Sequence, residues 1–185
     1  MAKKNHIIYR DTRFELYGKG ILHVGAMAPE FQIIAHNLGD IESEILNRDA
    51  LKNLRMPVLI SVSPTLDTPI GKKQAITFNK KVERYVEQSA LIFVSSDLPF
   101  AINRFFDEHV IDNLLGCSDY KDKSFGKNWG LLIEEPEVLA RAVIVLDKDL
   151  TVQYIELVEI IENEPNYDAA IEVLDRLISK GPAAS

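Results

Sequence analysis

The sequence predicts an α/β fold in which a central mixed β-sheet is flanked by helices. Two continuous apolar runs, PVLISV at 57–62 and ALIFV at 90–94, are rich in β-branched residues, as buried central strands are. Apolar residues recur at helical spacing between these runs and again near the end of the chain. Strands that alternate with helices pack as layers around one core, which favours an α/β sandwich.

The first elements are predicted strands. IIYR at 7–10 and FELY at 14–17 flank the pair Asp11-Thr12 and predict an N-terminal β-hairpin, because turn-forming residues separate two strand-like runs. FQII at 31–34 predicts a further strand ahead of the first buried run.

Two helices are predicted in the middle of the chain. The first follows Gly71 and has one apolar face, with lysines between the apolar positions. The second is short and begins at Pro99, since proline is favoured in the first turn of a helix. The apolar positions of the two helices are Ala75, Phe78, Val82, Tyr85 and Val86, and then Ile102, Phe105 and Phe106.

The last third of the chain predicts a hairpin and a helix. ARAVIVL at 140–146 and VQYIELV at 152–158 flank a polar turn and indicate an antiparallel pair of core strands. A C-terminal helix is then expected between Pro165 near its start and Gly181 at its end. Its apolar face comprises Tyr167, Ala170, Ile171, Leu174, Leu177 and Ile178.

Length and composition indicate one domain over residues 1–181, followed by a short tail at 182–185. The chain is 46% hydrophobic and 26% charged, as globular domains are. Its net charge of -7 gives no reason to expect binding to nucleic acid or to an anionic membrane. No apolar run approaches the roughly 20 residues that span a bilayer, and no signal peptide is evident, so a cytoplasmic protein is expected.

The cysteine and histidine content gives no reason to expect a metal or another cofactor. One cysteine, Cys117, excludes an internal disulfide and a thiolate metal cluster. We interpret it as a small buried hydrophobic residue, and the alternative is a reactive thiol. The four histidines share no ligand spacing of the i, i+4 kind: His6, His23, His36 and His109.

The loop SVSPTLDTPIG at 61–71 closely resembles the active-site loop of the thiol peroxidase branch of the peroxiredoxins. The pattern of that family is proline, three residues, threonine, two residues, and then the cysteine that attacks peroxide. Pro64 and Thr68 match this pattern, but Gly71 stands at the cysteine position.

The resemblance extends over most of the chain, in the order of the family. It implies a thioredoxin-like (peroxiredoxin) fold, which the order of the predicted elements allows without singling it out. The further matching segments are VGAMAPEF at 24–31, SSDLPFAINRFF at 95–106, WGLLIEEPEVLARAVIVLD at 129–147 and ENEPNYDAAIEVL at 162–174.

The resemblance also implies roles for individual residues. Pro64 would shield the loop, Thr68 would offer its hydroxyl to the peroxide, and Arg141 would lower the pKa of the thiol and bind the peroxide. Gly71 replaces the peroxidatic cysteine, and Phe106, at the end of NRFF, replaces the resolving cysteine. Peroxide reduction needs a thiolate nucleophile, and both redox thiols are gone.

Three hypotheses follow for the function. The favoured one is a non-catalytic protein that acts by binding or dimerisation, as a homodimer or as the partner of an active homologue or of a thioredoxin-type reductant. The alternative is a thiol-dependent peroxidase that uses Cys117 or an unrecognised route. A third is a sensor of small anions, in which a helix N-terminus, Thr68 and Arg141 surround a vestigial pocket.

Overall fold

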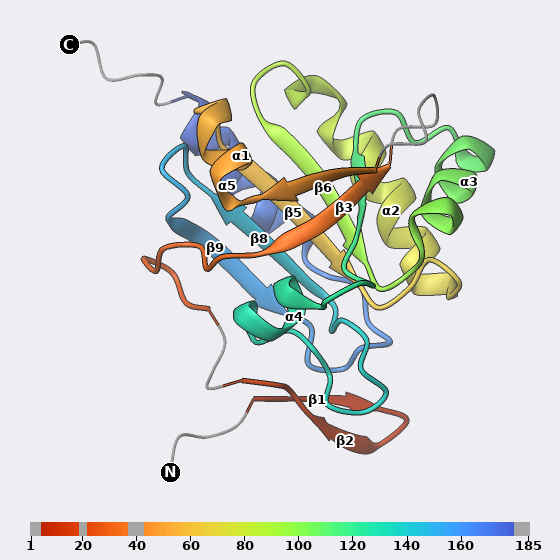
Figure 1. Ribbon diagram of the computed structural model, residues 1–185. Helices are drawn as coiled ribbons and strands as arrows, with labels where there is room; N and C mark the ends of the chain where they lie inside the picture. The colour runs from red at the N-terminus through yellow and green to blue at the C-terminus, as the bar shows by residue number, and fades with distance from the viewer. Residues whose placement is uncertain (1–4, 19–21, 37–42, 180–185) are drawn as a thin grey trace.

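A seven-stranded mixed sheet forms the centre of the computed structural model, which describes residues 5–18, 22–36 and 43–179 (Figure 1). Its strands, in chain order, are β3 (Gln32–His36), β4 (Ser43–Asn47), β5 (Val58–Ser63), β6 (Ala90–Ser95), β7 (Leu115–Ser118), β8 (Ala142–Leu146) and β9 (Val152–Leu157).

The spatial order of the strands is β4-β3-β7-β6-β5-β8-β9. The three central strands β7, β6 and β5 run parallel, and β3 and β8 pair antiparallel on either side of them. Every residue of β5 and of β8 is buried, which explains why β8 is wholly apolar and why β5 is apolar except for Ser61 and Ser63.

Helices cover both faces of this sheet. Helices α1 and α4 pack on one face, where Leu51, Phe125 and Trp129 join the core, and α2, α3 and α5 pack on the other. The helices span Arg48–Leu54 (α1), Pro69–Val82 (α2), Pro99–His109 (α3), Ser124–Trp129 (α4) and Tyr167–Ser179 (α5), and a short 3-10 helix, η1 (Glu83–Tyr85), follows α2.

A separate two-stranded hairpin, β1 (His6–Tyr9) with β2 (Thr12–Glu15), lies beneath one end of the sheet in Figure 1. Its main-chain bonds fix it to two distant segments: the Ile8 N–H donates to the Glu159 carbonyl at 2.7 Å, and the Glu134 N–H donates to the Glu15 carbonyl at 3.0 Å. A small third core, which includes Ile7 and Ile161, forms under the hairpin.

The predicted fold class and hairpin are confirmed, with local differences. Arg10 and Asp11, with φ of 46° and 62°, form the hairpin turn, so Thr12 belongs to β2 and pairs with Tyr9. Val86 was predicted on the buried face of α2, but the α-helix ends at Val82 and Val86 is exposed.

Strand β4 and helix α1 were not predicted. The Asn47 side chain caps α1 by accepting the Ala50 N–H at 2.9 Å, a local signal that the sequence carries. The predicted helix stop at Gly181 and the tail at 182–185 lie outside the described residues.

Candidate functional site

The loop at residues 64–68 joins the end of β5 to the start of α2. Thr68 has an extended backbone, and its Oγ1 accepts the Gly71 N–H at 3.0 Å, so it is the N-cap of α2. Pro69 follows in the first turn, where its missing N–H costs no hydrogen bond. This cap places Gly71 in the first turn of the helix, beside the loop.

The loop backbone occupies the space next to Gly71. A Cβ atom at Gly71 would lie 2.0 Å from the Thr65 carbonyl oxygen. It would also lie closer than ordinary van der Waals contact to the side chains of Thr68 and Ser63, at 3.0 and 3.1 Å. The first distance is far below any contact between packed atoms. The place where a residue-71 side chain would begin is therefore filled by the loop backbone.

Asp97, from the segment between β6 and α3, holds the loop in this position. Its carboxylate accepts the Thr65 hydroxyl at 2.6 Å and the Leu66 N–H at 2.7 Å. The Ser95 hydroxyl donates to the same carboxylate at 2.8 Å, and the Ser63 hydroxyl donates to the Thr65 carbonyl at 3.2 Å. Charge-assisted hydrogen bonds of this kind are the stronger ones, so the loop conformation is well determined.

Arg141 immediately precedes β8, and only 2% of its surface is exposed. Its Nε donates to the Ile161 carbonyl at 2.9 Å, and its Nη1 donates to Ser63 Oγ at 3.2 Å and to Gln74 Oε1. Burial lowers the pKa of the guanidinium to about 10, so it remains protonated at neutral pH. Its hydrogen-bond partners are thus a carbonyl, a hydroxyl and an amide, and none of them is charged.

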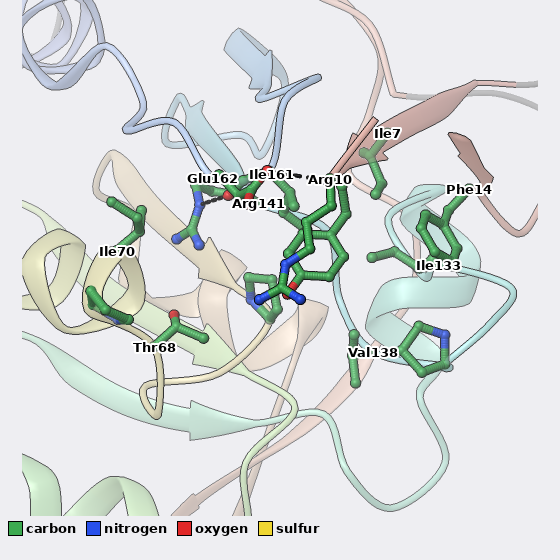
Figure 2. Close-up of a pocket in the computed structure, with 14 residues that line it drawn as sticks. Ile7, Arg10, Phe14, Thr68, Ile70, Ile133, Val138, Arg141, Ile161 and Glu162 are labelled. Carbon is green, nitrogen blue, oxygen red and sulfur yellow. Dashed lines mark hydrogen bonds between the residues drawn. The ribbon is translucent and has the colours of Figure 1, made fainter. Parts of the chain in front are cut away.

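A cavity of about 460 Å³ opens between the loop, the hairpin and the start of β8 (Figure 2). Three residues singled out from the sequence, Pro64, Thr68 and Arg141, line it together. Figure 2 shows the Arg141 guanidinium turned toward Thr68 and Ile70. The other lining residues are Ile7, Tyr9, Arg10, Phe14, Pro69, Ile70, Ile133, Pro136, Val138, Ile161 and Glu162.

Phe106, at the second replaced position, is a core residue of α3. It is 8% exposed, its ring lies 6.0 Å from that of Phe93 in an edge-to-face arrangement, and it packs over Gly116. A large aromatic side chain therefore takes a packing role at the position where the resemblance implies a resolving thiol.

Cys117 lies in the interior of the sheet. Strand β7 lies between β3 and β6, and Cys117 pairs with Ala35 of β3 and with Val94 of β6. The Cys117 side chain has no exposed surface. Burial raises the pKa of its thiol far above the usual range. This agrees with the interpretation of Cys117 as a buried hydrophobic residue, because reactive cysteines need exposure and a depressed pKa.

Sequence reasoning missed two groups of site residues. Gln74 is fully buried and orients the Arg141 guanidinium, while its own Nε2 donates to Ser61 Oγ at 2.8 Å. A glutamine next to Ala75 on the apolar face of a helix was a visible signal. The hairpin residues Ile7 and Phe14 carried no such signal, because only the tertiary fold brings them to the loop.

The described residues contain neither a metal-binding cluster nor a membrane-spanning helix. Among residues 5–18, 22–36 and 43–179, no group of three or more His, Cys, Asp or Glu side chains is placed to hold a metal ion. Within the same ranges no helix has the length and apolar character needed to cross a membrane.

Comparisons with known proteins agree with this architecture. The family model described as Redoxin matches residues 23–171. A thiol peroxidase from Streptococcus parasanguinis is 42% identical over 153 residues, which make up 83% of this chain and 88% of that protein. A thiol peroxidase from Staphylococcus saprophyticus is 36% identical over 166 residues, covering 90% of this chain and 95% of the relative.

Solved structures show the same fold. A peroxiredoxin-like protein from Aquifex aeolicus superposes with a TM-score of 0.81 at 31% identity, over 94% of this chain and 97% of the other. A thiol peroxidase from Chromobacterium violaceum gives a TM-score of 0.79 at 20% identity, over 95% and 98% of the two chains. The chain therefore belongs to the thiol peroxidase branch of the redoxin (peroxiredoxin) family, and its one cysteine is Cys117.

Proposed function

We propose that this chain is a non-catalytic thiol peroxidase homologue that acts by binding a ligand in the cavity beside Arg141, without reducing peroxide. The position of the Thr65 carbonyl carries this proposal. At 2.0 Å from where a Cβ of residue 71 would lie, it leaves no room for a nucleophilic side chain. Removal of the nucleophile from such a site removes the covalent chemistry and leaves only binding interactions.

The state of Cys117 supports the same proposal. A peroxidase that used this thiol would need to bring peroxide into the middle of the sheet and ionise a fully buried sulfur whose pKa is raised. The retained Pro64, Thr68 and Arg141 give no substitute nucleophile, because a proline, a capping threonine and a guanidinium do not attack peroxide.

A peroxidase assay tests the proposal. The full chain, with a thioredoxin system or a dithiol as reductant, is expected to consume hydrogen peroxide and an organic hydroperoxide no faster than buffer. Intact-mass spectrometry after mild peroxide treatment is expected to show no oxidised form of Cys117 in the folded protein. The same treatment in denaturant is the control, since the exposed thiol is then oxidised. Reductant-dependent turnover would refute the proposal.

We also propose that the protein is a cytoplasmic homodimer, or pairs with an active homologue, through the surface beside the loop. Leu98 and Phe100 follow Asp97 directly and are 53% and 72% exposed, which is high for large apolar side chains. Sedimentation is expected to give twice the chain mass of 20.9 kDa. Phe100→Ser is expected to weaken the dimer, whereas Val86→Ser, at an exposed apolar residue after α2, is expected to leave it unchanged.

A further inference from the structure

We infer that the cavity ligand is a monocarboxylic acid with an apolar body, whose carboxylate binds Arg141 and Thr68 and whose body lies against the hairpin wall. This inference rests on the proposed binding function and names the class of ligand. Three observations carry it: a buried cation that has no direct ion-pair partner among the described residues, two hydrogen-bond donors on the cavity, and apolar walls of suitable size.

Among the described residues no carboxylate forms a direct ion pair with Arg141. Burial lowers the pKa of Arg141, and the charge of Glu164, which acts on it from a greater distance, partly offsets this effect. The hydrogen-bond partners of Arg141 are neutral, and the nearby Glu164 carboxylate is already bound by Lys73 Nζ at 2.5 Å and by the Tyr167 hydroxyl at 3.0 Å. Buried charges in proteins are normally paired, because an isolated one carries a large desolvation cost. A bound carboxylate would supply the missing negative charge.

Two donors on the cavity are available for that carboxylate. In the described part of the chain the guanidinium bonds through Nε and Nη1, and Nη2 makes no hydrogen bond. Arg141 lines the cavity, and Figure 2 shows its guanidinium turned toward Thr68. The Thr68 oxygen accepts the Gly71 N–H, and no described acceptor takes its own hydroxyl hydrogen. Each donor can serve one carboxylate oxygen.

The walls select an acid with an apolar body. A volume of about 460 Å³ falls within the range of small-molecule sites. A chloride or acetate would leave this surface wet. The charged side chains that line the cavity are two arginines, Arg10 and Arg141, and one glutamate, Glu162, so their formal charges sum to +1 and a monoanion matches them better than a dianion. The apolar lining comes from the hairpin, the first turn of α2, the segment before β8 and the segment after β9: Ile7, Phe14, Ile70, Ile133, Val138 and Ile161.

The test is calorimetric titration of the full chain with 3-phenylpropanoate and hexanoate as probes, beside their primary amides, acetate, chloride and phosphate. Each acid is expected to bind at least tenfold more tightly than its amide, which has the same shape without the charge. Each acid is also expected to bind at least tenfold more tightly than acetate, which has the charge without the apolar body.

Variants separate the two parts of the site. Arg141→Gln is expected to weaken the binding of 3-phenylpropanoate at least tenfold. Val138→Trp is expected to abolish this binding, because the larger side chain fills the cavity. Arg104→Gln is the matched control, because Arg104 is an exposed arginine of α3 outside the cavity, and binding should not change. If Arg141→Gln fails to fold, the acid-to-amide ratio of the unaltered chain and Val138→Trp still decide the question.

The outcomes distinguish this inference from the function on which it rests. The ligand assignment would be overturned if the two acids bound no more tightly than their amides. It would also be overturned if the Val138→Trp variant still bound the acids. No binding of either acid by a chain that also fails to reduce peroxide would reject this ligand class and leave the non-catalytic function standing. Peroxide turnover would instead reject the proposed function itself.

Discussion

A Cβ atom at position 71 would lie 2.0 Å from the Thr65 carbonyl oxygen. Gly71 therefore has a structural role, besides lacking the reactive side chain of a cysteine. In most helices Gly→Ala stabilises by about 1 kcal/mol. At this position we expect Gly71→Ala to lower the free energy of unfolding by about 1–3 kcal/mol, because the added methyl forces the loop out of place. Urea denaturation measures the change.

The control for position 71 is Lys72→Ala, an exposed neighbour in the same turn, which should change the free energy of unfolding by less than about 0.5 kcal/mol. For the same steric reason, Gly71→Cys alone is expected not to restore peroxidase activity. A stabilised Gly71→Ala protein, or an active Gly71→Cys protein, would show that the loop yields easily.

Asp119 makes a second residue-scale prediction. Its buried carboxylate accepts the Phe125 and Gly126 N–H groups at 3.1 and 2.8 Å. Burial raises its pKa from 3.8 to about 7, although these two hydrogen bonds lower it. Between about pH 4 and pH 7 the native state therefore binds more protons than the unfolded state, and stability from this group falls as pH rises.

The Asp119 prediction is tested by urea denaturation at several pH values. The contribution to the slope is at most about 1.4 kcal/mol per pH unit. Asp119→Asn is expected to flatten the curve between pH 4 and pH 7, at the cost of one main-chain hydrogen bond. Asp112→Asn, at an exposed acid that is not among the groups that shift the Asp119 pKa, is the control. A slope that Asp119→Asn leaves unchanged would show that this carboxyl is ionised throughout.

At the scale of elements, the loop before α2 and the segment before α3 form one unit through Asp97. Its carboxylate bonds to Thr65 and Leu66 hold the loop against Gly71. Asp97→Ala should release the loop and lower the free energy of unfolding by about 2–3 kcal/mol, as expected for bonds to a charged group. The loop could then move away from position 71.

A double-mutant cycle measures this connection. In the Asp97→Ala background, Gly71→Ala should destabilise less than in the unaltered chain, with a coupling of about 1 kcal/mol between the two sites. Lys72→Ala in place of Gly71→Ala should give no coupling to Asp97. Additive effects of Asp97→Ala and Gly71→Ala would mean that Asp97 does not hold the loop in place.

At the scale of the whole molecule, the sequence predicted what depends on local pattern. Buried strands such as β5, the apolar face of α2 and the final hairpin were visible as periodicity and turn chemistry. The start of α2 was predicted too late, after Gly71, because the Thr68 N-cap and Pro69 were not taken into account. The short edge strand β4 and helix α1 were missed, because they are brief and carry few buried residues. Contacts between distant segments were also invisible, as with the hairpin wall of the cavity and the Thr65 carbonyl beside Gly71.

The hairpin β1–β2 should open independently of the main sheet. Its apolar contacts belong to the small third core around Ile7 and Ile161, which is separate from the two cores that hold the central strands. Elements with few buried contacts unfold locally at lower free energy than the whole protein. Hydrogen exchange of the Ile8 and Ile161 amides, which bond across this junction, should therefore be faster than that of amides in β5.

Ile7→Ala tests whether the hairpin is a separate cooperative unit. Truncation of a buried isoleucine to alanine lowers stability by about 2–5 kcal/mol. Here we expect it to weaken the docking of the hairpin on the rest of the protein. We expect the Ile8 and Ile161 amides to lose protection while amides of β5 and β6 keep theirs. Val145→Ala, in the core between the sheet and α5, should lower protection throughout. If Ile7→Ala also lowers protection in β5, the hairpin folds with the sheet as one unit, and the cavity between them is as rigid as the core.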